Sequence, residues 1–314
     1  MSICMPAYNA GKYINEAVGS ILKQSYKNWE LIIVNDGSTD DTGALIGDFT
    51  DPRIRVYEQE NKGQCAAANK AFSYSSGELI KFMDADDIIS VDFIREQVAR
   101  LGASKNVIAS ASWGRFYDDD LATFKLAKKY IVDDCRPIDW LINALEHKNA
   151  MMQCAIWLIP RSILERSGLW DESLNLINDL EFFIRVLLKA DEIRLTPNAV
   201  LYYRSGLPDS LSALKSRAGA ESAFNSTLKG TSYILEQESS PRARKVVADC
   251  FQNYVYTFYP YHTDLLLRAQ NKIAELGGSN AQFTAGGYTD LLTKIIGWKR
   301  TKKIKSWWSE LNLR

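Results

Sequence analysis

Cysteine and histidine are scarce in this sequence. Its 314 residues include five cysteines and two histidines. The cysteines are odd in number and widely scattered, and they form no C-x-x-C pair, which argues against a disulfide framework or a structural zinc site. His147 and His262 are far apart in the sequence, and neither lies in a cluster with the spacing of metal ligands. This composition fits a reducing compartment, so we expect a cytoplasmic protein.

Long apolar runs are also missing. The longest, near Ala155–Pro160, is far shorter than the ~20 residues that span a bilayer. No charged segment followed by an apolar stretch opens the chain, and a turn signal arrives at Pro6, so we expect no secretory signal. We predict a protein that does not cross a membrane by itself.

The chain has no excess of charge of either sign. It contains 38 basic and 38 acidic residues, which gives a formal net charge of zero. No global attraction to nucleic acid follows from such a balance, and we expect no nucleic-acid partner. Apolar residues make up 46% of the chain, as in globular proteins, and the length suits one large domain or two ordinary ones.

Strand-like and helix-like patterns alternate in the first hundred residues. Short apolar runs bounded by Gly, Asp, Asn or Pro lie at residues 2–5, 30–36, 54–59 and 78–84. Helical periodicity lies between and after them, at about residues 14–22, 40–48, 63–73 and 90–101. This order predicts βαβ units and therefore an α/β fold with a mostly parallel sheet covered by helices on both faces.

Beyond residue 101 the alternation loosens, and we predict a mixed second half with helices around 138–146 and 179–188. After Leu211 the pattern is helical, with Pro241 as a break, and it ends in a basic, Trp-rich tail. We therefore predict an α/β domain over residues 1–210 and a C-terminal helical extension over residues 211–314.

Three carboxylates follow the last strand of the first half within four residues: Asp84, Asp86 and Asp87. Open parallel sheets bind ligands outside the carboxyl ends of their strands. Clustered carboxylates suit a hard divalent cation that is shared with substrate phosphates. The structural alternative is that Asp86 or Asp87 caps the helix that follows. A single D-x-D triplet arises often by chance, so both interpretations stay open on this motif alone.

Four further motifs accompany the carboxylates. They are MPAYNAGKYI at Met5–Ile14, VNDGSTDDT at Val34–Thr42, NKGQCAAANKA at Asn61–Ala71 and INDLEFFIR at Ile177–Arg185. In order and spacing, these motifs and MDADD resemble family 2 glycosyltransferases of the GT-A type, over about residues 2–205. As a set, they are specific to that family.

The resemblance implies a GT-A-type, Rossmann-like fold with a mixed, mostly parallel sheet. It implies an enzyme that moves a sugar from a nucleoside-diphosphate sugar to an acceptor hydroxyl, in the synthesis of cell-surface polysaccharide or a lipid-linked glycan. Residues 1–101 would form the nucleotide-binding half of the domain, and residues 102–210 the acceptor half.

On the donor side, the resemblance places Pro6, Ala7 and Tyr8 beside the nucleotide base. It gives Asp36 a hydrogen bond from the base or the ribose. Lys62 lies in the opening of the helix whose start is near the donor.

Family members often carry Arg where this chain has Ala68. One cation for the donor is then missing, and Lys62 or a later arginine would replace it. The same resemblance directs Arg204 to the diphosphate, because guanidinium pairs with phosphate oxygens in a bidentate manner. The alternative is a surface arginine at the end of a strand.

The D-x-D motif of the family matches Asp84 and Asp86. The resemblance directs Asp84 toward the ribose and makes Asp86 the ligand of Mn²⁺ or Mg²⁺. The metal would stabilise the departing nucleoside diphosphate.

Asp179 aligns with the catalytic base of the family, which takes the proton of the acceptor hydroxyl. Asn178 stands where the family usually has an acidic residue, so one carboxylate is available at this pair. The structural alternative is that Asp179 caps a helix. With one base and no nucleophile in place, we predict direct displacement with inversion of the anomeric centre.

Two other functions compete with this interpretation. One is a GT-A-like sugar-binding or scaffold protein with impaired catalysis, which the departures at Ala68 and Asn178 leave open. The other is a sugar-phosphate nucleotidylyltransferase, which also uses a parallel sheet and Mg²⁺. That enzyme needs a Gly- and Arg-rich loop after the first strand, and PAYNAGKYI offers none.

The C-terminal tail combines basic and aromatic residues. Five cations lie within seven residues, from Lys299 to Lys305, and Ile304, Trp307, Trp308 and Leu311 fall on one helical stripe. Such a helix can lie on an anionic membrane surface, which suits a lipid-linked acceptor and a peripheral place on the inner face of the membrane. It can equally dock its tryptophans onto the body of the protein.

Overall fold

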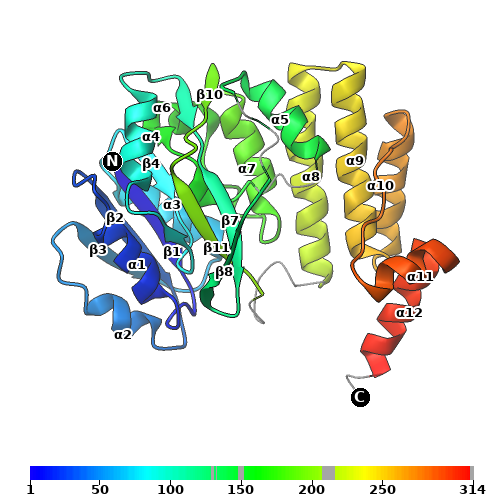
Figure 1. The fold of residues 1–314 in the computed structure, drawn as a ribbon, viewed down its shortest axis with the longest axis horizontal. Coiled ribbons are helices and arrows are strands. Elements are labelled where there is room, and N and C mark those ends of the chain that lie inside the picture. Colours follow the sequence, from blue (N-terminus) through cyan, green and yellow to red (C-terminus); the bar gives the residue numbers. More distant parts are fainter. Residues whose placement is uncertain (129–130, 132, 148–151, 207–215, 312–314) are drawn as a thin grey trace.

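The computed structural model describes residues 1–128, 131, 133–147, 152–206 and 216–311 (Figure 1). Its first sheet has the strand order β3-β2-β1-β4-β9. Neighbouring strands among the first four are parallel, and β9 is antiparallel to β4. The strands are β1 (Ser2–Ala7), β2 (Glu30–Asp36), β3 (Ile54–Gln59), β4 (Leu79–Phe82) and β9 (Ile159–Pro160).

Helices connect these strands in the predicted alternation: α1 (Ile14–Leu22), α2 (Thr42–Gly47), α3 (Gln64–Tyr74) and α4 (Phe93–Leu101). The centre of β2, from Leu31 to Val34, is completely buried, as expected for a strand that is covered on both faces. On α1, the residues Ile14, Ala17, Val18 and Ile21 share one buried face.

The second half is mixed, as predicted. Its four-stranded sheet has the order β5-β11-β7-β8, in which β11 and β7 are parallel and the outer pairs are antiparallel. A separate parallel pair joins β6 to β10. The strands are β5 (Ile88–Ile89), β6 (Val107–Ala109), β7 (Ser112–Tyr117), β8 (Asp120–Leu126), β10 (Glu192–Arg194) and β11 (Val200–Arg204). The expected α/β class with a mixed, mostly parallel sheet is confirmed.

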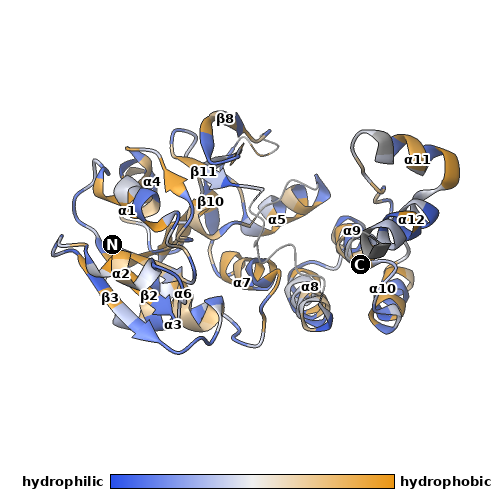
Figure 2. Cartoon of the chain, turned by 90° about the horizontal axis from the view of Figure 1, so that it is seen from below, coloured by the Kyte–Doolittle hydropathy of each residue, from blue (hydrophilic) through white to orange (hydrophobic). Residues whose placement is uncertain are grey.

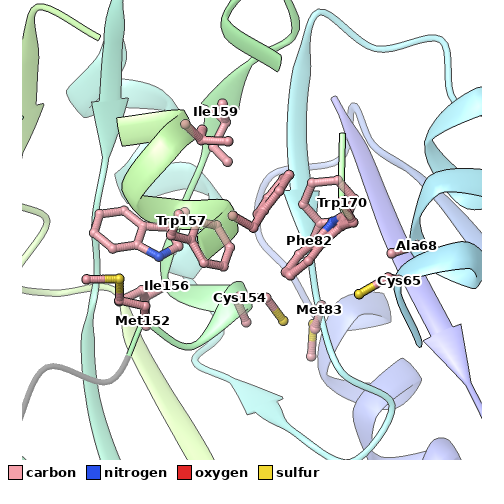
Figure 3. Close-up of a cluster of buried hydrophobic side chains, with 14 of the residues drawn as sticks. Cys65, Ala68, Phe82, Met83, Met152, Cys154, Ile156, Trp157, Ile159 and Trp170 are labelled. Carbon is pink, nitrogen blue, oxygen red and sulfur yellow. The ribbon is translucent and has the colours of Figure 1, made fainter. Parts of the chain in front are cut away.

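Aromatic side chains fill the core between the two halves (Figure 3). Trp157 lies on one side of this cluster, and Phe82 and Trp170 lie on the other. Phe183 contacts both tryptophan rings, with centroid distances of 5.8 Å to Trp157 and 5.5 Å to Trp170. The helices of this region are α5 (Pro137–Glu146), the 3₁₀-helix η1 (Cys154–Ile156), α6 (Arg161–Ser167) and α7 (Asn178–Leu187).

Helices dominate the C-terminal region, as predicted. They are α8 (Arg217–Gln237), α9 (Pro241–Phe258), α10 (Thr263–Glu275), α11 (Tyr288–Ile296) and α12 (Trp298–Leu311). Pro241 does begin a helix, after Ser240, whose hydroxyl accepts a hydrogen bond from Ala243 N. The single expected break at Pro241 does not account for the two helices α9 and α10 that follow it. A second break follows Phe258, because Pro260 lacks an amide proton and cannot continue a helix.

The C-terminal helices share their core with the α/β part. Figure 1 shows α8 standing beside α7. A side chain at Gly230 of α8 would meet Leu180 O at 3.2 Å and the Cα of Glu181 at 3.3 Å, so glycine permits this close approach. Ser226 of α8 donates a hydrogen bond to Ile177 O at 2.5 Å and accepts one from Glu181 N. Thus α8 fixes the beginning of α7.

Candidate active site

The carboxylates of Asp84, Asp86 and Asp87 form a cluster between the end of β4 and the start of β5. One ligand oxygen from each lies within 4.8 Å of the others. In the described part of the chain, this is the one group of three or more residues that could hold a metal ion. The interpretation of Asp86 or Asp87 as a helix cap is wrong, because β5 intervenes and α4 begins after Asp92.

Burial and mutual repulsion disfavour the charged forms of these carboxyls. Burial raises the pKa of Asp84 above its usual range. Burial, followed by the charge of Asp84, raises the pKa of Asp86 to about 7. Asp87 is completely buried, and burial together with the charges of Asp86 and Asp84 raises its pKa well above the ordinary value.

This donor set fits a hard divalent cation. It offers three carboxylates, and a positive charge among them would relieve their repulsion. Asp87 already accepts hydrogen bonds from the Gln153 side chain and from Arg204 N. Asp86 is partly exposed, so its carboxylate lies nearer to solvent than that of Asp87.

Gln153 is a buried partner of the cluster that the sequence did not reveal. Its Nε2 donates to the carboxylate of Asp87 and, at 3.5 Å, to Asp84 Oδ2. Its Oε1 accepts a hydrogen bond of 2.8 Å from Ala155 N, at the start of η1. The sequence feature that could have indicated its role is a polar residue directly before the apolar residues 154–159.

Lys81 anchors the same region from inside β4. The residue is fully buried, and its Nζ donates to Ala155 O at 2.7 Å and to Trp157 O at 2.9 Å. Its ammonium also lies 4.6 Å from the ring centroid of Phe93. Burial lowers the pKa of Lys81 to about 7. The sequence signal was a lysine in the middle of an apolar strand.

Asp36 ends β2 and holds the loop that leads into α3. Its Oδ1 accepts hydrogen bonds from Gln59 Nε2 at 2.7 Å and from Lys62 N at 2.8 Å. Its Oδ2 accepts one of 2.8 Å from Gly63 N. The backbone of Gly63 has φ 90°, a conformation that favours glycine. Asp36 is 2% exposed, whereas the Lys62 side chain reaches solvent.

The predicted base-binding residues lie at the end of β1, between β2 and β4. Pro6 and Ala7 belong to the strand itself, where Ala7 pairs with Asn35 of β2. Tyr8 follows the strand and is 50% exposed. The structure thus brings Tyr8 to the same edge of the sheet as Asp36, and the assignment of these residues to the nucleotide stays a prediction.

Asp179 lies in the first turn of α7. The N-cap position belongs to Ile177, whose φ is 58°, so the interpretation of Asp179 as the cap residue is wrong. Burial first, and then the charge of Asp84, raise the pKa of Asp179 well above its ordinary value. The charge of Asp84 thus disfavours a second negative charge at Asp179.

Asn178 connects α7 to the carboxylate cluster through α3. Its Nδ2 donates to Gln64 Oε1 at 3.3 Å and to Cys65 Sγ at 3.1 Å. Gln64 in turn donates from Nε2 to Asp84 Oδ1 at 2.8 Å. The side-chain amide of Asn178 therefore has a structural role. The sequence showed only that the family usually has an acidic residue at this position.

Arg204 ends β11 and is 2% exposed, so the interpretation as a surface arginine is wrong. Its Nε donates to Asp86 O at 2.9 Å, and its Nη2 donates to Glu16 Oε2 at 2.6 Å. A further ion pair joins it to Asp119. The guanidinium lies 4.7 Å from the ring centroid of Tyr13 and at the same distance from another ring, that of Phe116.

These contacts bind the Arg204 guanidinium to the protein itself. Through Asp86 O, the side chain fixes the backbone of the carboxylate cluster. Its predicted contact with a diphosphate stays a prediction. Residues 207–215 lie outside the described residues.

The family model "Glycosyl transferase family 2" matches residues 2–167, which is more than half of the chain. Glycosyltransferase GlyG of Streptococcus pneumoniae is 47% identical over 97 residues, which cover 30% of this chain and 32% of GlyG.

A second relative is UDP-Glc:alpha-D-GlcNAc-diphosphoundecaprenol beta-1,3-glucosyltransferase WfgD of Escherichia coli. It is 40% identical over 102 residues, which cover 32% of this chain and 40% of WfgD. The chain thus matches less than half the length of either curated relative. Residues 1–349 of S. aureus TarS, in a complex with UDP-GlcNAc, superpose with a TM-score of 0.68 at 17% identity, covering 88% of this chain and 80% of that one.

Proposed function

Because this chain belongs to glycosyl transferase family 2, we propose that it transfers a sugar from a nucleoside-diphosphate sugar to an acceptor hydroxyl. One observation carries the proposal. Asp179 lies in the first turn of α7, and hydrogen bonds through Gln64 link its neighbour Asn178 to Asp84 of the carboxylate cluster. A transfer reaction needs these two features together: a site for a diphosphate with its cation, and a base for the acceptor.

We assign the nucleotide to the edge of the sheet where β1 and β2 end. Pro6, Ala7 and Tyr8 would contact the base. Asp36, which positions the loop that carries Lys62, would accept a hydrogen bond from the base or the ribose. The exposed Lys62 side chain is then available for the diphosphate. The solved TarS structure holds UDP-GlcNAc in a protein of the same fold, which supports a nucleotide-sugar donor.

The carboxylate cluster is the proposed cation site. Asp86 would hold Mn²⁺ or Mg²⁺ with Asp84 directed to the ribose, and the cation would stabilise negative charge on the departing diphosphate. Gln153, just before η1, donates a hydrogen bond to Asp87 of the cluster, and Lys81 donates one to Ala155 O within η1. Arg204 fixes its backbone through Asp86 O.

Asp179 is the proposed general base. It would accept the proton of the acceptor hydroxyl while the oxygen attacks the anomeric carbon and the nucleoside diphosphate leaves from the opposite face. A single displacement of this kind inverts the anomeric configuration. A raised pKa makes the carboxylate a stronger base once it has lost its proton.

The proposed acceptor is a glycan of the cell surface or its lipid-linked precursor. Support comes from the name of the relative WfgD, which acts on a sugar carried by diphosphoundecaprenol. We place the reaction in the cytoplasm, at the inner face of the membrane. None of the described helices combines the length and hydropathy that a bilayer span requires.

The test is release of the nucleoside diphosphate from a panel of nucleotide sugars, with Mn²⁺ and a mixture of glycan acceptors. Turnover of one donor, with an inverted product by proton NMR, is the expected result. Donor binding without turnover for any acceptor would favour the sugar-binding protein with impaired catalysis.

A further inference from the structure

The C-terminal hairpin, which we define as α11 and α12, contacts the C-terminal end of α9. Trp298, at the start of α12, contacts Tyr256 and Tyr259 with centroid distances of 4.8 and 5.1 Å. Thr301, one turn later, is 1% exposed. Upstream of the hairpin, Asp249 of α9 accepts hydrogen bonds from the loop, including Ala281 N at 3.0 Å. The hairpin is therefore held firmly at its base.

The hairpin also exposes many large apolar side chains. Its large side chains are Leu291 (58% exposed), Leu292 (41%), Ile295 (70%), Ile304 (43%), Trp307 (60%) and Trp308 (61%). The expectation that the tail docks its tryptophans onto the body holds for Trp298 alone and is wrong for Trp307 and Trp308. Exposure of this many large apolar groups on one element indicates a surface that binds something.

Positive charge is concentrated on the same hairpin. Six of the 38 basic residues lie within residues 288–311, but only two of the 38 acidic ones, so the rest of the chain has an acidic excess. The exposed cations are Lys294, Lys299, Arg300, Lys303 and Lys305. A partner with a negatively charged surface and an apolar interior would match both the positive charge and the exposed apolar side chains of the hairpin.

We propose that the C-terminal hairpin docks on an anionic lipid bilayer. Its leucine, isoleucine and tryptophan side chains would enter the boundary between headgroups and acyl chains, and its lysines would pair with lipid phosphates. A second copy of this chain fits less well, because contact through these side chains would bring two basic hairpins together. Nucleic acid would leave Leu291 and Ile295 without an apolar partner.

A pocket between α9 and α12 adds a place for a headgroup. Its volume is about 540 Å³, and Tyr256, Phe283, Lys302 and Lys305 are among the residues that line it. Lys302 Nζ is held at 3.2 Å from Thr257 O. Aromatic walls beside two ammonium groups suit a phosphorylated lipid headgroup.

The position of the hairpin agrees with docking. In Figure 1 it lies at the lower end of the molecule, the end at which α2 follows the carboxyl end of β2. Figure 2 views the molecule from this end and shows the apolar residues of α11. A docked hairpin would therefore turn the carboxyl ends of the sheet toward the bilayer. This inference concerns binding alone and does not depend on the transfer reaction.

The test is co-sedimentation of the full chain with phosphatidylcholine vesicles, with and without phosphatidylglycerol. We expect binding to the anionic vesicles only. The double variants Trp307→Ala/Trp308→Ala and Lys299→Glu/Arg300→Glu should each lower the partition coefficient roughly tenfold. As controls, Leu121→Ala/Leu126→Ala removes exposed apolar groups on β8, and Lys105→Glu changes a remote charge.

Thermal unfolding of each variant should match that of the original chain, because the altered side chains are exposed. Equal sedimentation of the hairpin variants and the original chain would overturn the proposal. So would equal binding to neutral vesicles. Concentration-dependent dimerisation that the tryptophan variant abolishes, without vesicle binding, would instead make the hairpin an interface between copies.

Discussion

Gln64 donates a hydrogen bond of 2.8 Å to Asp84, and this contact joins α3 to the end of β4. The side-chain oxygen of Gln64 accepts a hydrogen bond from the side chain of Asn178, at the start of α7. Asp179 follows Asn178 directly, so one glutamine links the carboxylate cluster to the proposed base. These hydrogen bonds hold the start of α7 next to the end of β4.

Replacement of Asp179 by asparagine tests the proposed base. Asp179→Asn should keep donor affinity within about twofold, because the proposed donor site lies on the side of the carboxylate cluster, and should lower kcat by roughly 10²–10⁴. Donor Kd and initial rates of diphosphate release give the two quantities. Asp191→Asn, an exposed residue beyond α7, is the matched control. Full turnover by Asp179→Asn would remove this residue from the mechanism.

Gln153→Ala tests the support of the cluster. Loss of the amide leaves the carboxylates of Asp87 and Asp84 with one donor fewer, so the free energy of unfolding should fall by about 1–3 kcal/mol. Affinity for Mn²⁺ should also fall, by roughly 10-fold or more. Urea unfolding and calorimetric titration measure these effects, with the exposed Gln270→Ala as control. Unchanged values for both would mean that the amide contact contributes nothing.

Lys81→Met tests the buried ammonium. Methionine fills most of the same space but leaves the carbonyls of Ala155 and Trp157 without their donor, and we expect a loss of about 1–3 kcal/mol in unfolding free energy. The exposed Lys105→Met should change stability by less than about 0.5 kcal/mol. Equal stability of the two variants would show that Lys81 does not hold η1.

The carboxylate cluster should make stability depend on pH when divalent cations are absent. The pKa of Asp86 rises from 3.8 in the unfolded reference to about 7 in the folded chain. Asp86 therefore takes up a proton on folding in this pH range. Its contribution to the free energy of unfolding is fully present below the unfolded pKa of 3.8 and is lost as the pH rises through the folded pKa of about 7. Between about pH 4 and pH 8 the chain should lose on the order of 2 kcal/mol through Asp86, about half of the full effect of the shift because the side chain is partly exposed.

Asp86→Asn removes that titration, so its stability should fall less over the same interval. Denaturant unfolding at both pH values, with EDTA present, supplies the comparison. The exposed Asp48→Asn should behave as the original chain does. A parallel pH profile for Asp86→Asn and the original chain would contradict the raised pKa.

Local sequence patterns predicted the helices and strands of the α/β part well. The spacing of apolar residues and the residues at the ends of each element determine secondary structure over short stretches of the chain. The expected strands at 30–36 and 54–59 match β2 and β3 to the residue. The second break in the C-terminal helices was missed, since the apolar periodicity typical of a helix is present on both sides of Pro260. The helical backbone cannot continue through this proline.

Long-range contacts within the site could not be read from the sequence. Gln153 and Asp87 are 66 residues apart, and Arg204 and Glu16 are 188 apart. Motifs identify which carboxylates gather at the strand ends, because strand ends meet at one edge of the sheet. They do not show which distant side chains satisfy those carboxylates, since that depends on how separate elements pack.

The most direct test of the account is thermal unfolding of the full chain with UDP-, GDP-, CMP- and dTDP-sugars, each with and without Mn²⁺. Selective binding to the folded state at a hundredfold excess over Kd stabilises it by about 2.7 kcal/mol. The account predicts such a shift for one nucleotide, dependent on Mn²⁺, absent in Asp86→Asn and retained in Asp48→Asn. No shift with any donor, or a full shift in Asp86→Asn, would contradict a metal-assisted nucleotide-sugar site at this cluster.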